Sequence, residues 1–161
     1  MIWLRAKVSS MPRKINHLKG TVMKPEVTEL TPAGEQRKLR LKISTAYHNQ
    51  KKRAAKKGAR LNYQVLDLQA SAMDGPLLCH FCGISLTSLN LSVDHLTPIS
   101  REGTWDLDNL AFVCLPCNLA KHELTEVEFS NLRTLIKTWP LNATRRFLAR
   151  LRSAGAKFRQ H

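Results

Sequence analysis

The sequence carries two short cysteine pairs, Cys79-His80-Phe81-Cys82 and Cys114-Leu115-Pro116-Cys117, with thirty-one residues between them. A two-residue spacer lets both sulfurs of a pair reach one ion, and zinc prefers a tetrahedral shell of thiolates. In a chain without an export signal, paired spacing of this kind indicates zinc and disfavours disulfides. We therefore expect one structural Zn2+ that joins two distant segments and is bound by Cys79, Cys82, Cys114 and Cys117.

The residues around the two pairs predict a small α+β domain. Residues 91–96 alternate apolar and polar side chains, which is typical of a strand, and residues 110–113 form a second apolar stretch that leads into the second pair. The spacing of Thr125 and Glu128 is that of a helix-capping box. Helices are predicted for 31–57, where Ser44-Thr45 could interrupt the helix, and for 63–73, 118–122, 125–137 and 143–153.

Charge is distributed in three blocks along the chain. Residues 1–60 contain sixteen Lys and Arg against three acids, a net charge of +13; residues 61–128 carry −7, and residues 129–161 carry +8. Cations that neutralise phosphates release condensed counterions, which supplies affinity for nucleic acid without reading its sequence. A solvated, solubilising surface is the alternative explanation. We favour two basic extensions that bind nucleic acid around an acidic centre that binds cations.

These patterns divide the chain into four parts. We expect a basic arm at 1–30, a basic helical DNA-binding region at 31–75, a zinc-containing core at 76–138 and a basic C-terminal helix at 139–161. The repeated basic residues favour phosphate contact over base readout. The residues predicted to contact nucleic acid are Arg37, Lys38, Arg40, Lys51, Lys52, Arg53, Lys56, Lys57, Arg60, Lys121, Arg145, Arg146 and Arg150.

Four polar residues in and beside the core have the chemistry of a divalent-cation site. Asp94 and His95 are adjacent on a predicted strand, so their side chains point to opposite sides. Asn118 and His122 are four apart on a predicted helix and share a face. Carboxylate oxygen, amide oxygen and imidazole nitrogen suit a hard or intermediate divalent cation. Each residue alone is a weak signal, since Asn118 could be a helix cap and His122 a solvated histidine.

In combination these motifs resemble the four-cysteine, zinc-knuckle branch of the HNH (ββα-metal) endonucleases. The resemblance covers about residues 77–130 and rests on Cys79-His80-Phe81-Cys82-Gly83, Val93-Asp94-His95-Leu96-Thr97-Pro98, Asp108-Asn109-Leu110 and Cys114-Leu115-Pro116-Cys117-Asn118-Leu119-Ala120-Lys121. It implies a small ββα-metal core, stapled by the four cysteines and flanked by basic helical extensions. The residues that give the family its name correspond to His95, Asn109 and Asn118.

The resemblance also implies roles for individual residues. His95 would be the general base, and Asn109 would orient the loop that carries it through backbone hydrogen bonds. Asp94 and Asn118 would bind a single catalytic ion, Mg2+ or Mn2+, and the products would be 5′-phosphate and 3′-hydroxyl ends. His122 matches a further ligand of the bacterial-toxin branch, whereas the zinc-knuckle branch often has glycine there, so its ligand role stays open. The assignment requires an imidazole at 95 that solvent can reach.

The sequence predicts an endonuclease whose partner is double-stranded DNA, with RNA less favoured. The alternative is a zinc-knuckle protein that binds DNA or RNA without cutting it. No run of about 18 apolar residues is present, so we expect no membrane span. A charged residue follows Met1 too soon for a secretory signal, so we expect an intracellular protein. The sequence leaves the biological role open among homing, restriction, phage packaging and repair. It also leaves open whether the protein is a monomer or a homodimer.

Overall fold

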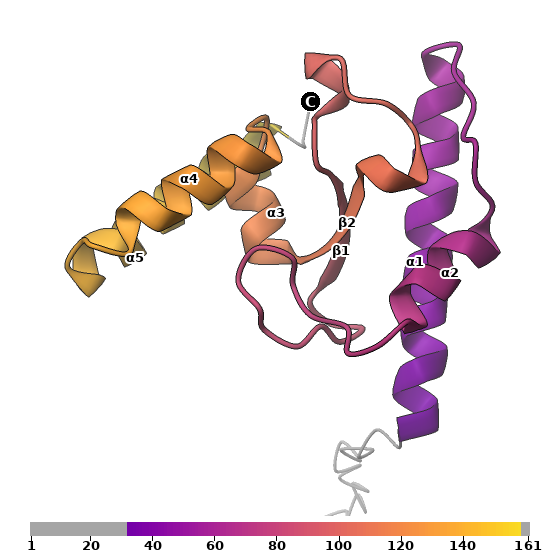
Figure 1. Cartoon of the computed structure of the whole chain (residues 1–161), viewed down its shortest axis with the longest axis horizontal. Helices are drawn as coiled ribbons and strands as arrows, with labels where there is room; N and C mark the ends of the chain where they lie inside the picture. The colour runs from indigo at the N-terminus through magenta and orange to yellow at the C-terminus, as the bar shows by residue number, and fades with distance from the viewer. Residues whose placement is uncertain (1–31, 159–161) are drawn as a thin grey trace, which may run out of the picture.

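The computed structural model describes residues 32–158, in which helices surround a two-stranded antiparallel sheet (Figure 1). The predicted α+β class is confirmed. The predicted arm at 1–30 and the charged N-terminus lie outside the described residues. In chain order the elements are α1 (Pro32–Lys56), α2 (Val65–Met73), β1 (Leu91–His95), two short 3-10 helices η1 (Ile99–Arg101) and η2 (Leu107–Asn109), β2 (Leu110–Cys114), α3 (Leu115–Lys121), α4 (Glu126–Ile136) and α5 (Leu141–Phe158).

The sheet separates two groups of helices. β1 and β2 pair from Leu91 opposite Cys114 to His95 opposite Leu110. Because side chains alternate along a strand, His95 lies on one face of β1 and Asp94 on the other. Figure 1 shows α1 and α2 on one side of the sheet and α3 on the other. The side chain of His95 thus belongs to the α1 side, and that of Asp94 to the α3 side.

Helix α1 runs without interruption, so the break considered at Ser44-Thr45 does not occur. The hydroxyl of Thr45 donates to the carbonyl of Leu41 at 2.9 Å, one turn earlier in the same helix, so this polar side chain finds a partner without ending the helix. Four side chains at spacings of four, three and four residues form the buried stripe of this helix: Ile43, Tyr47, Gln50 and Ala54. This spacing places them on one face, and the basic residues occupy the rest of the surface.

The core is continuous from α1 to the sheet. Ile43 and Tyr47 of α1 belong to the same buried cluster as Leu91 and Val113 of the strands. At the start of α1, the carboxylate of Glu35 accepts hydrogen bonds from the backbone N–H and the hydroxyl of Ser88, at 2.5 and 3.0 Å. The buried cluster therefore crosses the predicted boundary at residue 75, and α1 is attached along its length to the segment that carries the cysteines.

The last two helices complete the α3 side of the molecule. Thr125 and Glu128 form the predicted capping box at the start of α4. Helix α5 packs so closely on α3 that a Cβ at Gly155 would lie 2.1 Å from the carbonyl oxygen of Leu119. Leu148 of α5 also packs against the core. α5 is thus held against α3, and only a residue without a side chain fits at their closest approach.

Candidate active site

The four cysteines come together although they are far apart in sequence. Their sulfur atoms all lie within 4.8 Å of one another, and the sulfurs of Cys82 and Cys114 are 3.7 Å apart. A tetrahedral shell with zinc–sulfur bonds of about 2.3 Å places its sulfurs roughly 3.8 Å apart. None of the four forms a disulfide. The cluster therefore has the composition and the spacing of a structural zinc site.

The surroundings of the sulfurs shift their pKa values in different directions. Burial, reinforced by the neighbouring sulfurs, raises the pKa of the Cys117 thiol far above its usual range, and burial raises that of Cys114 to about 11. Burial also raises the pKa of Cys79, but backbone N–H donors, first that of Cys114 at 3.2 Å, outweigh it and lower the value to about 7. Four clustered thiolates repel one another, and a dication removes that repulsion.

On the α3 side of the sheet, Asp94 and Asn118 face a common region. The amide nitrogen of Asn118 donates to the hydroxyl of Ser92 at 2.6 Å. Ser92 is two residues before Asp94, so their side chains leave β1 on the same face. Asn118 is 5% exposed, and the Asp94 side chain is 18% exposed. A carboxylate and an amide oxygen at one face supply the hard donors that Mg2+ prefers.

Lys121 occupies the interior of this region. Its side chain is 0% exposed, and its ammonium group donates to the carbonyl oxygen of His95 at 2.7 Å. The same ammonium lies 3.2 Å from a carboxylate oxygen of Asp94. We predicted that Lys121 contacts nucleic acid, but the structure places its charge in the core, where a phosphate cannot reach it. Its role here is to bind the backbone of His95 and the side chain of Asp94.

The imidazole of His95 lies on the opposite face and is covered. His95 is 6% exposed, and the Trp105 ring packs edge-on against it with centroids 5.3 Å apart. Burial, followed by the charges of Arg53 and Lys121, lowers the pKa of His95 to about 4. Its Nε2 atom is buried and has no hydrogen-bond partner within residues 32–158. The imidazole is therefore neutral at neutral pH. We expected solvent to reach this imidazole, whereas the structure buries it.

Asn109 braces the loop that follows His95. Its side-chain oxygen accepts from the backbone N–H of Thr97 at 2.9 Å, and its amide nitrogen donates to the carbonyls of Thr97 and Thr104 at 3.0 and 2.8 Å. Its own carbonyl accepts from the N–H of Leu96 at 2.8 Å. One side chain thus closes the loop between the strands.

Helix α3 ends at Lys121, so His122 lies just beyond it and does not share a helical face with Asn118 as predicted; its backbone conformation is unusual. Its φ is 51° and its ψ is −119°, and its N–H donates to the carbonyl of Asn118 at 3.2 Å. Backbone angles of this kind favour glycine and cost of the order of 1–3 kcal/mol for other residues. Strain that a glycine would relieve is found at functional sites, where the side chain itself is needed. This conformation explains why glycine suits the position.

The described residues contain one group of three or more His, Cys, Asp or Glu side chains with ligand atoms close together, namely the four cysteines. Asp94, His95 and His122 do not form a second such group. The geometry of the strand accounts for part of this result, because Asp94 and His95 point away from each other. An ion on the α3 side would therefore depend on the amide of Asn118 and on water as well as on Asp94.

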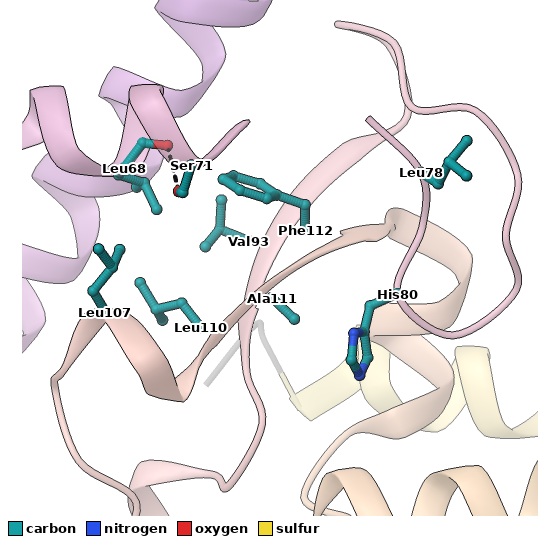
Figure 2. Close-up of a pocket in the computed structure, with 9 residues that line it drawn as sticks. All are labelled: Leu68, Ser71, Leu78, His80, Val93, Leu107, Leu110, Ala111 and Phe112. Carbon is teal, nitrogen blue, oxygen red and sulfur yellow. Dashed lines mark hydrogen bonds between the residues drawn. The ribbon is translucent and has the colours of Figure 1, made fainter. Parts of the chain in front are cut away.

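The predicted nucleic-acid contacts, except for Lys121, are exposed. They lie on α1 and the turn after it, and on α5. Figure 1 shows these two helices on opposite sides of the sheet. An apolar groove of about 320 Å³ lies elsewhere, between α2 and the sheet, where Leu68 and Ser71 face Val93 and Phe112 (Figure 2). Neither Asp94 nor His95 lines this groove, so it does not belong to the candidate site.

Two comparisons with known proteins bear on this segment. The family model described as HNH endonuclease matches residues 79–124. This segment is an HNH-family domain. A search of the curated proteins found no match to the chain. The HNH domain contains both cysteine pairs, the whole sheet and α3, and it indicates nuclease activity in general.

Two residues near the HNH site were not assigned to it from the sequence. Lys121 is three positions after Asn118, and this helical spacing could have placed it against β1. Trp105 lies in an irregular loop, and no pattern in the sequence indicates that it covers His95. Arg53, predicted as a phosphate contact, lies with its guanidinium carbon 5.9 Å from the centroid of the Trp105 ring. Helix α1, outside the matched segment, thus reaches the candidate active site.

Proposed function

We propose that the protein is a metal-dependent endonuclease that hydrolyses phosphodiester bonds of double-stranded DNA. The observation that carries the proposal is the arrangement at the end of β1, where Asp94 and His95 project to opposite faces and Asn109 braces the following loop. This arrangement lies inside the segment that matches the HNH endonuclease model. Together they support a base and a cation site held on either side of one strand.

His95 is the proposed general base. A neutral imidazole can accept a proton from the attacking water, and the low pKa of His95 keeps it neutral at physiological pH. The ammonium of Lys121 holds the His95 carbonyl, and the Asn109 side chain holds Thr97, two residues further on. These contacts keep the imidazole in one position, which reduces the entropy lost when the reacting groups are aligned.

Asp94, Asn118 and His122 are the residues proposed to hold a divalent ion, Mg2+ or Mn2+. The donor types suit such an ion, and the backbone strain at His122 supports a role for its side chain. A bound ion would neutralise charge on the phosphate and the departing 3′ oxygen. The expected products are ends with a 5′-phosphate and a 3′-hydroxyl.

The exposed basic residues of α1 and α5 are proposed to bind the DNA backbone. Their side chains are in solvent, as phosphate contact requires, and they extend beyond the HNH domain on both sides. We propose that 31–75 and 139–161 act as DNA-binding parts around the core at 76–138. No helix in the described part of the chain is long and apolar enough to cross a membrane. An intracellular nuclease of a mobile element, a phage or a restriction system is consistent with these features.

A plasmid-nicking assay tests the proposal. The zinc-loaded protein should nick supercoiled DNA with Mg2+ or Mn2+ and should stop when EDTA is added. His95→Ala should lose cleavage by at least about a hundredfold and still shift DNA in a gel. The matched control is His48→Ala, which removes an exposed histidine from α1. Full cleavage by His95→Ala would overturn the assignment of the base, and preferential cleavage of RNA would overturn the DNA substrate.

The burial of His95 favours one alternative, a zinc protein that binds DNA without cutting it. In that case the wild-type protein would shift DNA in a gel and leave it intact with either Mg2+ or Mn2+. His95→Ala would then bind DNA as the wild type does. The same assay therefore separates the two functions.

A further inference from the structure

The cover over His95 consists of two side chains from different parts of the chain. Trp105 comes from the loop between η1 and η2, and its ring stands at 90° to the imidazole. Arg53 comes from the last turn of α1, and its guanidinium lies over the Trp105 ring. Arg53 itself is exposed. A solvated guanidinium is thus linked through one aromatic ring to the buried imidazole.

This arrangement poses a problem for the function proposed above, on which the present inference rests. A general base must come within hydrogen-bond reach of the proton that it removes. The Nε2 atom of His95 is buried, and the guanidinium of Arg53 lies 5.9 Å from the centroid of the Trp105 ring that covers the imidazole. A substrate phosphate that approached Arg53 would arrive at the edge of this cover.

We propose that Arg53 binds the scissile phosphate beside His95, and that in the DNA-free protein its contact with Trp105 keeps the imidazole covered. The guanidinium has planar, paired N–H donors that match a phosphate in two parallel hydrogen bonds. Its contact with Trp105 is a cation–π interaction at an exposed site, which is weak in water. A phosphate therefore replaces the Trp105 ring as the partner of Arg53. Trp105 then loses its contact with the guanidinium on its solvent side.

The backbone around Trp105 restricts how the cover opens. Asn109 holds the carbonyl of Thr104, the residue before Trp105, at 2.8 Å. Gly103 packs so tightly that a Cβ there would lie 2.0 Å from the carbonyl oxygen of Thr97. The loop is therefore fixed on one side of Trp105, and opening takes place by rotation of the indole side chain. The base keeps its position while its cover moves.

A kinetic comparison on the zinc-loaded full-length protein tests the role of Arg53. Arg53→Ala should lower kcat on saturating plasmid DNA by at least about tenfold, because a contact made at the reacting phosphate is lost. Arg53→Lys should recover part of the loss, since it keeps the charge without the paired donors. The matched control is Lys52→Ala, which removes the same charge about 100° around the helix. It should raise KM, as a lost backbone contact does, and lower kcat much less.

Chemical modification tests the cover without depending on cleavage. Diethyl pyrocarbonate acylates accessible neutral imidazoles, and mass spectrometry of peptides follows His95 against the exposed His48. His95 should react slowly in the wild type and severalfold faster in both Trp105→Ala and Arg53→Ala.

Two results would overturn the proposal and leave the nuclease assignment intact. If His95→Ala is inactive while Arg53→Ala has the kcat of Lys52→Ala, Arg53 is an ordinary backbone contact. If acylation of His95 is no faster in Trp105→Ala, the indole does not cover the imidazole. If the wild-type protein does not cleave DNA at all, by contrast, the proposed function itself is refuted.

Discussion

Replacing Lys121 by methionine tests the interpretation of the cation-site face most directly. Methionine keeps the length and much of the volume of the lysine stem, so the change removes the charge and opens little space. It deletes the hydrogen bond to the His95 carbonyl and the ion pair with Asp94. Lys121 is fully buried, which makes the ammonium part of the interior and not a surface charge.

The size of the effect follows from these two contacts. A hydrogen bond from a charged group contributes about 1.5–3 kcal/mol, and removing one partner of a buried ion pair costs about 3–5 kcal/mol. These two energies count partly the same interaction, so they do not add. The Asp94 side chain is 18% exposed, so water compensates part of the energy that the carboxylate loses with its partner. We expect Lys121→Met to lower the free energy of unfolding by about 3 kcal/mol. Adding Asp94→Asn to Lys121→Met should restore about 1–2 kcal/mol, because the carboxylate is then neutral as well.

Urea unfolding at a fixed concentration of free zinc, followed by circular dichroism, measures these differences. The control is Lys137→Met at the exposed end of α4, which should change stability by less than about 0.5 kcal/mol. If Lys121→Met is as stable as the wild type, the buried ammonium does not stabilise this face. If Asp94→Asn lowers stability equally with and without Lys121, the two side chains are not coupled.

Three further perturbations test other parts of the site. His122→Gly should raise the free energy of unfolding by about 1 kcal/mol, because the strained backbone suits glycine, and should weaken Mn2+ binding, followed by electron paramagnetic resonance, about tenfold or more; greater stability with unchanged Mn2+ affinity would remove His122 from the ligands. His95 has a pKa of about 4 in the folded protein and about 6.5 when unfolded, so the unfolded state takes up the proton first as the pH falls. Stability is then lost below the unfolded pKa, by about 1 kcal/mol between pH 7 and 5.5; urea titrations at both pH values should show a smaller loss in His95→Gln, and an equal loss would contradict the assignment. Chelating the zinc, or replacing Cys117 by serine, should abolish the cooperative thermal transition, since a structural zinc site contributes about 10 kcal/mol or more; an unchanged Tm after verified removal of the metal would show that the cluster is dispensable.

Spacing alone was enough to predict the parts of the site that are local in sequence. The two cysteine pairs predicted the sulfur cluster, because each pair is a turn that points two sulfurs in one direction. The adjacent positions of Asp94 and His95 predicted side chains on opposite faces, because side chains alternate along any strand. Each of these predictions depends on the geometry of one short element.

The features that the sequence did not predict depend on contacts between distant elements. A lysine is nearly always exposed, so the burial of Lys121 follows only from the packing of α3 on β1. The cover over His95 needs α1 to reach the loop at Trp105, more than fifty residues later in the chain. The same packing makes α1 part of the core, which its basic composition did not indicate.

The four-sulfur cluster has a consequence for how this protein can be built into others. Its cysteines lie at both ends of the segment that contains Asp94, His95 and Asn109, so the two ends of that segment meet in space. A cassette with adjoining ends can be inserted into an unrelated host chain at a surface loop without stretching either partner. Such a cassette has to include α1 and α5 as well, because Ile43 and Tyr47 of α1 are buried with the strands and Gly155 of α5 packs directly on α3.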